Sequence, residues 1–130
     1  MKLTVVSVIA FFISTPVFAQ DPGAIGFGTV AEAYAALRKD AKAEFLIQEG
    51  WVVAKVTGGP HSGVWSFTPN THPAHPAVIK RFPAEIGGQL AIRMQALCGG
   101  PKPACDQLVE HFKKLNEQVA RDIQQRKGGK

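Results

Sequence analysis

Acidic side chains are scarce in this chain, and the scarcity argues against most hydrolytic active sites. Only 10 of the 130 residues are Asp or Glu. Outside the predicted helices and hairpin edges these residues are Asp21, Glu44 and Glu49. None of them belongs to a pair of carboxylates of the kind that glycoside hydrolysis requires.

Sequence signatures of catalysis and of nucleotide binding are also missing. Ser62, in the stretch GPHSG, stands one residue away from its place in a Gly-x-Ser-x-Gly nucleophile elbow. The glycines of GAIGFG, residues 23–28, come in the wrong order for a dinucleotide-binding turn. We therefore predict that the protein is not an enzyme and that it uses no cofactor.

Cysteine is limited to two residues, Cys98 and Cys105, in the phrase CGGPKPAC. The Cys-x-x-Cys spacing of reactive thiol pairs is absent. The intervening residues include two Gly and two Pro, so the chain can turn back on itself. An oxidising compartment would join the two thiols, and we predict a structural disulfide.

Long apolar runs are lacking too. The longest, Leu3 to Ile13, follows a single basic residue and precedes Val17-Phe18-Ala19. This order is typical of a secretory signal peptide, residues 1–19, cleaved after Ala19. The run is too short to span a bilayer, which takes roughly 20 residues, and no cysteine for lipid attachment lies near the cut. We predict a periplasmic or secreted bacterial protein without an integral membrane segment after cleavage.

Basic residues exceed acidic ones, and the formal charge of the whole chain is +5. They are scattered instead of forming a stripe with interleaved aromatic residues, as nucleic-acid-binding surfaces do. Part of the excess lies in the terminal residues 126–130. Nucleic acid is therefore not an expected partner.

Two helices are predicted from apolar residues at helical spacing. The first runs from Val30 to Lys42 and begins with a capping box formed by Thr29 and Glu32. The second, from Pro103 to Gln125, carries the apolar stripe Leu108, Phe112, Leu115, Val119 and Ile123. Extended segments are predicted at 51–57, 64–67, 77–86 and 89–97. Residues 44–50 could continue the first helix, but Phe45, Leu46 and Ile47 favour an extended segment there as well.

These elements predict an α+β fold, in which an N-terminal helix, a three- to four-stranded antiparallel sheet and a C-terminal helix follow one another, with both helices on the same sheet face. Residues 20–28 are expected to be a flexible lead-in, 29–127 a single domain and 128–130 a disordered tail. For the last hairpin we predict a three-residue loop, Gly87 to Gln89, because it pairs Ile86 with Leu90 and collects apolar residues on one face. Pro83 indicates an edge strand or a bulge.

The segment from Gly58 to Pro76 holds three of the four histidines and four of the nine prolines. Prolines favour polyproline II, whose three-residue repeat would put His72 and His75 on the same side. We interpret the segment as a contact surface formed by Trp65, Phe67, His72 and His75. Core burial of Trp65 and Phe67 is the competing interpretation.

The resulting hypothesis is a small exported envelope protein that acts by non-catalytic binding of a protein, peptide or glycan through residues 58–76. The alternative is a transition-metal protein that binds Zn or Cu through His61, His72 and His75. Histidine is a common ligand of both metals, but two or three histidines alone are a weak signal.

Overall fold

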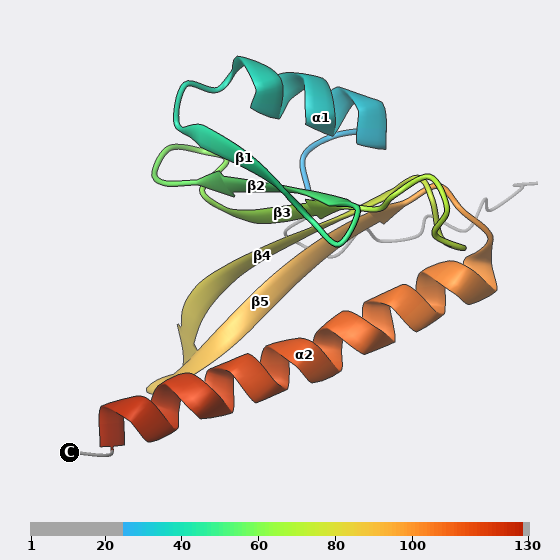
Figure 1. Ribbon diagram of the computed structural model, residues 1–130. Coiled ribbons are helices and arrows are strands. Elements are labelled where there is room, and N and C mark those ends of the chain that lie inside the picture. Colours follow the sequence, from blue (N-terminus) through green and yellow to red (C-terminus); the bar gives the residue numbers. More distant parts are fainter. Residues whose placement is uncertain (1–24, 129–130) are drawn as a thin grey trace, which may run out of the picture.

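The computed structural model describes residues 25–128, and the predicted signal peptide, lead-in residues 20–24 and residues 129–130 lie outside this range. Figure 1 shows a single antiparallel sheet with a helix on each side. The elements are α1 (Val30–Lys39), β1 (Ala43–Gln48), β2 (Trp51–Val56), β3 (Gly63–Phe67), β4 (Ala77–Ile86), β5 (Gln89–Cys98) and α2 (Lys102–Gly128). The α+β class is confirmed, and the sheet has five strands where three or four were predicted.

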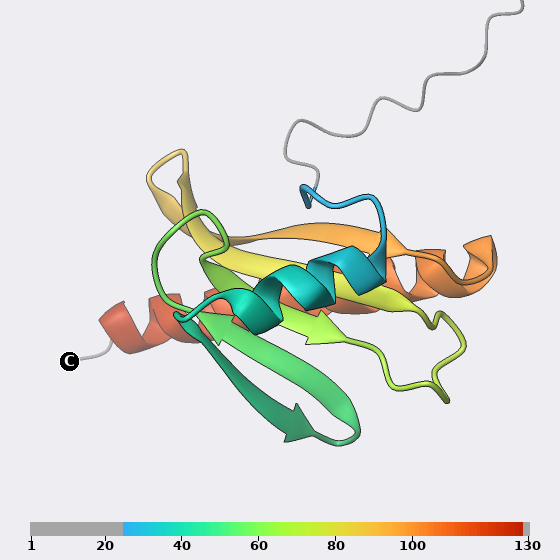
Figure 2. The ribbon, with the colours of Figure 1, turned by 90° about the horizontal axis from the view of Figure 1, so that it is seen from above.

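The two helices cover opposite faces of the sheet, so the prediction of a shared face was wrong (Figures 1 and 2). Side chains alternate between the faces along each strand. In β4, Val78 belongs to the core under α1, whereas Ala77 and Ile79 belong to the core under α2. Each helix therefore has its own hydrophobic core, and the sheet lies between them.

The α1-side core is the larger of the two. Leu37 and Ala33 from the helix are fully buried. They pack with sheet residues that include Ala54, Val56, Trp65, Phe67 and Val78. Ile25, from the expected flexible lead-in, is also buried in this core. Residues 25–28 are thus part of the packed domain.

Helix α1 begins as the sequence predicts and ends earlier. Thr29 Oγ1 accepts the N–H of Glu32 at 3.1 Å, while the carboxylate of Glu32 accepts the N–H of Gly28. The helix stops at Lys39 because the Asp40 N–H donates to the carbonyl of Leu37, in a turn toward β1. The following strand confirms that residues 44–48 are extended.

The β4–β5 hairpin has a two-residue turn, Gly87-Gly88, and the predicted three-residue loop was wrong. Ile86 pairs with Gln89, and both glycines have positive φ, +60° and +78°. Two-residue hairpin turns need this conformation, which glycine adopts at low cost. The prediction assumed one covered face. In a sheet covered on both sides, both faces can hold apolar residues: Met94 and Cys98 of β5 pack on the α2 side, while Leu97 and its partner Val78 pack on the α1 side.

Pro83 lies in the part of β4 that β3 does not reach. Strand β3 pairs with β4 only from Val78 to Arg81. Ala77 directs its carbonyl toward Thr68 on the β3 side, so backbone alternation also points Pro83 toward that side. Proline has no N–H, and at this position no ladder bond is lost. The prediction of an edge strand or a bulge was wrong for the strand itself, since β4 lies between β3 and β5 and its register with β5 is continuous, but Pro83 does lie where β4 has no neighbour on that side.

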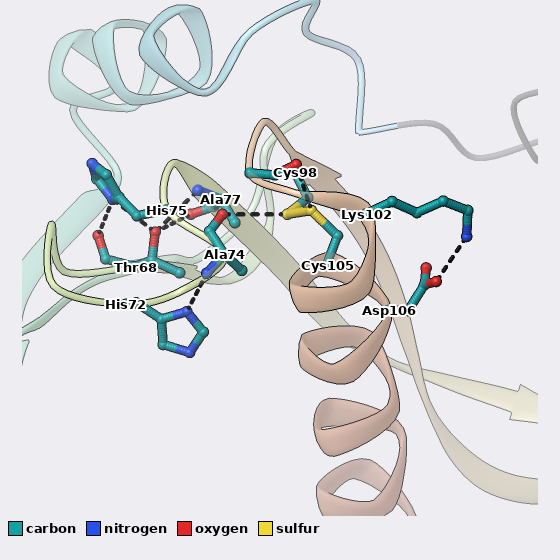
Figure 3. Close-up of a disulfide and its surroundings, with 10 residues drawn as sticks. Thr68, His72, Ala74, His75, Ala77, Cys98, Lys102, Cys105 and Asp106 are labelled. Atoms are coloured by element: carbon teal, nitrogen blue, oxygen red, sulfur yellow. Dashed lines mark hydrogen bonds and ion pairs between the residues drawn. A yellow bond between two sulfur atoms is a disulfide. The ribbon is translucent and has the colours of Figure 1, made fainter.

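The disulfide between Cys98 and Cys105 is present, with the two Cα atoms 5.9 Å apart. It connects the end of β5 to the first turn of α2 (Figure 3). None of the helices within residues 25–128 has the length and apolar character needed to cross a membrane.

Candidate functional site: an apolar cavity beside α1

The loop from Thr68 to Ala77 is a series of turns, and the polyproline II prediction was wrong. The N–H of His72 donates to the carbonyl of Pro69, and the N–H of His75 donates to the carbonyl of His72, both at 3.0 Å. The His75-Pro76 peptide bond is cis. Each bond closes one of two consecutive turns, in place of the solvated, hydrogen-bond-free backbone of polyproline II.

Because of these turns, His72 and His75 project to opposite sides (Figure 3). The His72 ring lies 5.3 Å from the ring of Trp51, in the core under α2. Its Nδ1 accepts the N–H of Ala74 at 3.0 Å. His75 extends toward α1 and lines a cavity there. The prediction of a shared side fails for this pair.

Trp65 and Phe67 belong to the core, so their role as an exposed contact surface is not supported. Trp65 is 0% exposed, and its indole N–H donates to the carbonyl of His61 at 2.8 Å. Phe67 is also buried, but its side chain lines the same cavity as His75. Strand alternation explains the result, because both residues face α1.

The three histidines proposed as metal ligands occupy three separate environments. His61 contacts Asp40 through Nδ1 at 3.1 Å, near the ring of Phe27. His72 and His75 lie beyond the other end of β3 and on opposite sides of the sheet. Residues 25–128 contain no group of three or more His, Cys, Asp or Glu side chains placed to hold a metal ion. This arrangement gives the metal-binding alternative no support.

The cavity beside α1, called the α1 cavity below, has a volume of about 430 Å³. It is formed where the first turns of α1 cross the ends of β2 and β3 and meet the loop before β4. The lining residues are Thr29, Val30, Ala31, Tyr34, Val52, Phe67, Thr68, His75, Pro76 and Ala77. Its walls are mostly apolar, with hydroxyl and imidazole groups among them. This is the usual character of a small-ligand or side-chain binding site.

Thr68 organises the wall that carries His75. The Thr68 N–H donates to the carbonyl of Ala77 at 3.0 Å, and Thr68 Oγ1 accepts the N–H of Ala77 at 3.0 Å. The Nδ1 of His75 lies 3.0 Å from Thr68 Oγ1 and 3.2 Å from the Thr68 carbonyl oxygen. Because a carbonyl only accepts, this arrangement favours the proton on Nδ1. The Nε2 atom is then left as a hydrogen-bond acceptor in the neutral ring.

The disulfide region supports the same wall from behind. The N–H of Gly99 donates to the carbonyl of Pro76 at 2.7 Å. A Cβ atom at Gly100 would lie only 2.5 Å from the carbonyl oxygen of Ala74. The two glycines therefore permit a close approach between the CGGPKPAC turn and the loop that carries His75.

Sequence reasoning found one wall of the α1 cavity and missed the other. Phe67 and His75 were predicted, but Val30, Ala31 and Tyr34 were assigned only to a helix. Tyr34 is the single tyrosine of the chain and is 38% exposed. Its position on the helical apolar stripe resembles that of an ordinary core residue. Tyr34 and His75 come together only because α1 crosses over β3, and no signal in the sequence predicts that crossing.

A second polar pair, Asp40 and His61, was also missed. The N–H of Lys42 donates to Asp40 Oδ1 at 2.9 Å, and Asp40 Oδ2 faces His61 Nδ1. The Lys42 hydrogen bond, followed by the His61 contact, holds the pKa of the Asp40 carboxyl below its ordinary value of 3.8. Ser62 Oγ accepts the N–H of Gly58, a role within its own loop. The pair connects the α1–β1 turn to the β2–β3 loop.

Comparison of the chain with protein-family models, with curated protein sequences and with solved structures found no match.

Proposed function

We propose that the protein is a non-catalytic binding module that holds an apolar group of a protein or peptide partner in the α1 cavity. The observation that carries this proposal is the cavity itself, an apolar hollow of about 430 Å³ with His75 in its wall. This volume lies within the range of roughly 300–1,000 Å³ of ligand pockets. It is large enough for an aromatic or branched aliphatic side chain.

The chemistry of the walls selects among the predicted partner classes. Val30, Val52 and Phe67 offer apolar surface, and burying such surface favours an apolar guest. A glycan would bring many hydroxyl groups into a cavity that has few groups to pair with them. Each unpaired buried hydroxyl costs about 1–3 kcal/mol. The walls therefore favour a peptide or protein side chain over a glycan.

The proposed place of action is the periplasm or the extracellular space. The disulfide supports this proposal, since such bonds persist mainly in oxidising compartments. The predicted signal peptide agrees with it.

Ala31→Phe tests the function directly, because Ala31 lines the α1 cavity and is exposed to solvent. A phenyl ring there would fill the hollow without entering the core. Ala35→Phe is the matched control on the same helix, also exposed and outside the cavity lining. The probe is the dye anilinonaphthalene sulfonate, which brings an apolar aromatic group, and its binding is followed by fluorescence titration.

We expect Ala31→Phe to weaken dye binding at least tenfold and Ala35→Phe to leave it unchanged. Equal dye affinity in the two variants would contradict the assignment of the binding site. Thermal unfolding of both variants checks that they are equally folded, since the helix-propensity cost of phenylalanine is similar at the two positions.

A further inference from the structure

Strand β1 forms one edge of the sheet, and within residues 25–128 its outer backbone groups have no strand partner (Figure 2). A two-residue turn, Glu49-Gly50, joins it to β2, with Gln48 opposite Trp51. The two residues that close such a turn, here Gln48 and Trp51, hydrogen-bond to each other. Every second residue of the strand therefore bonds to β2, and the residues between them direct their backbone groups away from β2. In β1 these are Ala43, Phe45 and Ile47. The Ala43 N–H donates to the carbonyl of Asp40, outside the β1–β2 ladder, in agreement with this alternation.

This edge lacks the features that usually prevent strand addition. Proline, lysine and bulges protect many edge strands. The free part of β4 has such protection, because Pro83 has no N–H to offer on the open side. The β1 sequence AEFLIQ contains no proline and no lysine, and its one charged residue, Glu44, lies on the sheet face opposite to that of Phe45 and Ile47. Ile47 is 76% exposed on it.

An apolar strip connects this edge to the α1 cavity. Ile47 pairs with Val52, which pairs with Phe67, so the three side chains form one row on the α1 side. Val52 and Phe67 line the cavity. Tyr34 bridges the strip from above, with its ring 5.9 Å from that of Phe45 and 5.3 Å from that of Phe67. The cavity and the edge are therefore parts of one surface.

Charge at the edge favours an acidic partner. The guanidinium of Arg38 lies over the ring of Phe45, 5.1 Å from its centre. Arg38 makes no salt bridge with any of the residues 25–128. A second copy of the chain, paired antiparallel through Phe45, would bring two Arg38 side chains together, and like charges repel. An acidic side chain two residues from an apolar one would instead pair with Arg38 and cover Ile47.

We propose that β1 accepts an extended peptide as an additional strand, with an acidic residue facing Arg38 and an apolar residue, two positions along, facing Ile47. Peptide recognition by strand addition is a common binding mode. This inference rests on the proposed function, since the strip from Ile47 leads the adjoining part of the peptide into the α1 cavity. Backbone pairing would supply affinity, and Arg38 and Ile47 would supply selectivity.

The test uses a fluorescein-labelled eight-residue peptide in which glutamate, leucine and valine alternate with threonine. A second peptide of the same sequence carries N-methyl groups on alternate residues, which removes the backbone donors of one edge. Binding is followed by fluorescence anisotropy. We expect the N-methylated peptide to bind at least tenfold more weakly than the unmodified one.

Ile47→Pro removes an N–H that points away from β2, so the hydrogen bonds between β1 and β2 stay in place. Its control is Ala96→Pro, an exposed outward position on the opposite edge strand β5. We expect only Ile47→Pro to weaken peptide binding, again at least tenfold. Ile47→Lys leaves the backbone unchanged, and we expect it to weaken peptide binding as well. This variant keeps the proposal testable if Ile47→Pro does not fold.

The outcomes separate this inference from the proposed function. Equal peptide affinity for Ile47→Pro, Ile47→Lys and Ala96→Pro would overturn strand addition, even if Ala31→Phe still abolished dye binding. A wild-type dimer in sedimentation equilibrium that Ile47→Lys converts to a monomer would overturn it in favour of a second copy. Equal dye binding by Ala31→Phe and Ala35→Phe would instead overturn the α1 cavity as the binding site.

Discussion

Gly100 shows how closely two loops approach each other behind the α1 cavity. A Cβ atom at this residue would meet the backbone of Ala74 at 2.5–2.9 Å, a distance at which something must move. At Gly99 the nearest atom would be Cγ of Pro76, at 3.2 Å. The neighbouring glycines thus differ in how much crowding a methyl group would cause.

We predict that Gly100→Ala destabilises the protein by about 1–3 kcal/mol, the usual cost of overpacking. Gly99→Ala should cost less, because only a proline ring and a carbonyl at 3.4 Å would have to adjust. Urea denaturation of the two variants measures the difference. Equal midpoints would show that the loop from Ala74 to Pro76 is less tightly held than the contacts indicate.

Asp40 gives the protein a pH-dependent contribution to stability. Its pKa is lowered in the folded state by the hydrogen bond from Lys42, then by His61. The ionised carboxylate therefore stabilises the fold fully above the ordinary pKa of 3.8, and this stability is lost as the pH falls through the lower folded-state pKa.

In Asp40→Asn the amide oxygen can still accept the Lys42 N–H, but the charge facing His61 is lost. We predict a lower melting temperature than wild type at pH 6, and a difference that shrinks as the pH falls below 3.8 and through the lowered folded-state pKa of Asp40. Thermal unfolding across this range is the measurement. A constant difference at all pH values would show that the charge of Asp40 does not contribute.

Individual residues also show the limit of sequence reasoning. The capping role of Thr29 and the pairing of Cys98 with Cys105 depend on local spacing, and both were predicted. The opposite directions of His72 and His75 depend on two consecutive turns in the loop, which a three-residue proline periodicity cannot reveal. Burial of Trp65 depends on which face α1 covers, and that is a property of the whole fold.

Helix α2 illustrates the same division among the secondary-structure elements. Its apolar stripe predicted the helix, whose 27 residues extend for about 40 Å. The apolar stripe does not predict on which face of the sheet the helix packs. In the structure the buried part of the stripe, Leu108 and Phe112, packs on the face that carries Trp51 and Arg81: the Phe112 ring lies 5.9 Å from the Trp51 ring, and the Arg81 guanidinium lies 5.2 Å from its centre.

We predict that Phe112→Ala destabilises the protein by about 3–5 kcal/mol, because it removes the main contact of α2 in a buried cluster. Leu115→Ala, one turn along the stripe and 38% exposed, is the control and should cost much less. Guanidinium denaturation compares them. Similar losses would mean that the exposed half of the stripe contributes as much as the buried half.

The hairpin of β4 and β5 shows why register was harder to predict than strand positions. Both strands were located within a residue of their observed ends. The predicted register depended on the assumption that one face of the sheet is solvated. That assumption is wrong for a sheet that lies between two helices. Arg81 opposite Met94 is acceptable here because the arginine covers Phe112 on the α2 side.

For the whole molecule, the disulfide is a second covalent connection between the sheet and α2, in addition to the main chain through residues 99–101. Closing a loop of this size stabilises a fold by about 2.5 kcal/mol in the chain-entropy model. The same turn holds Pro76 through Gly99, next to His75. Stability and the α1 cavity are therefore coupled through residues 98–105.

We predict that reduction lowers the free energy of unfolding by about 2 kcal/mol and also weakens dye binding in the α1 cavity. Denaturation and dye titration, each with and without dithiothreitol, measure the two effects. A mass increase of two hydrogen atoms confirms reduction. Unchanged dye affinity in the reduced, folded protein would show that the cavity wall does not depend on the disulfide.

The two-sided core places one tryptophan in each half of the molecule, and this makes the layers optically distinguishable. Trp65 lies under α1 and Trp51 lies against α2. The single-tryptophan variants Trp51→Phe and Trp65→Phe would therefore report by fluorescence on one layer at a time. Because β2, β4 and β5 each contribute residues to both cores, we expect the two emission signals to change at the same denaturant concentration.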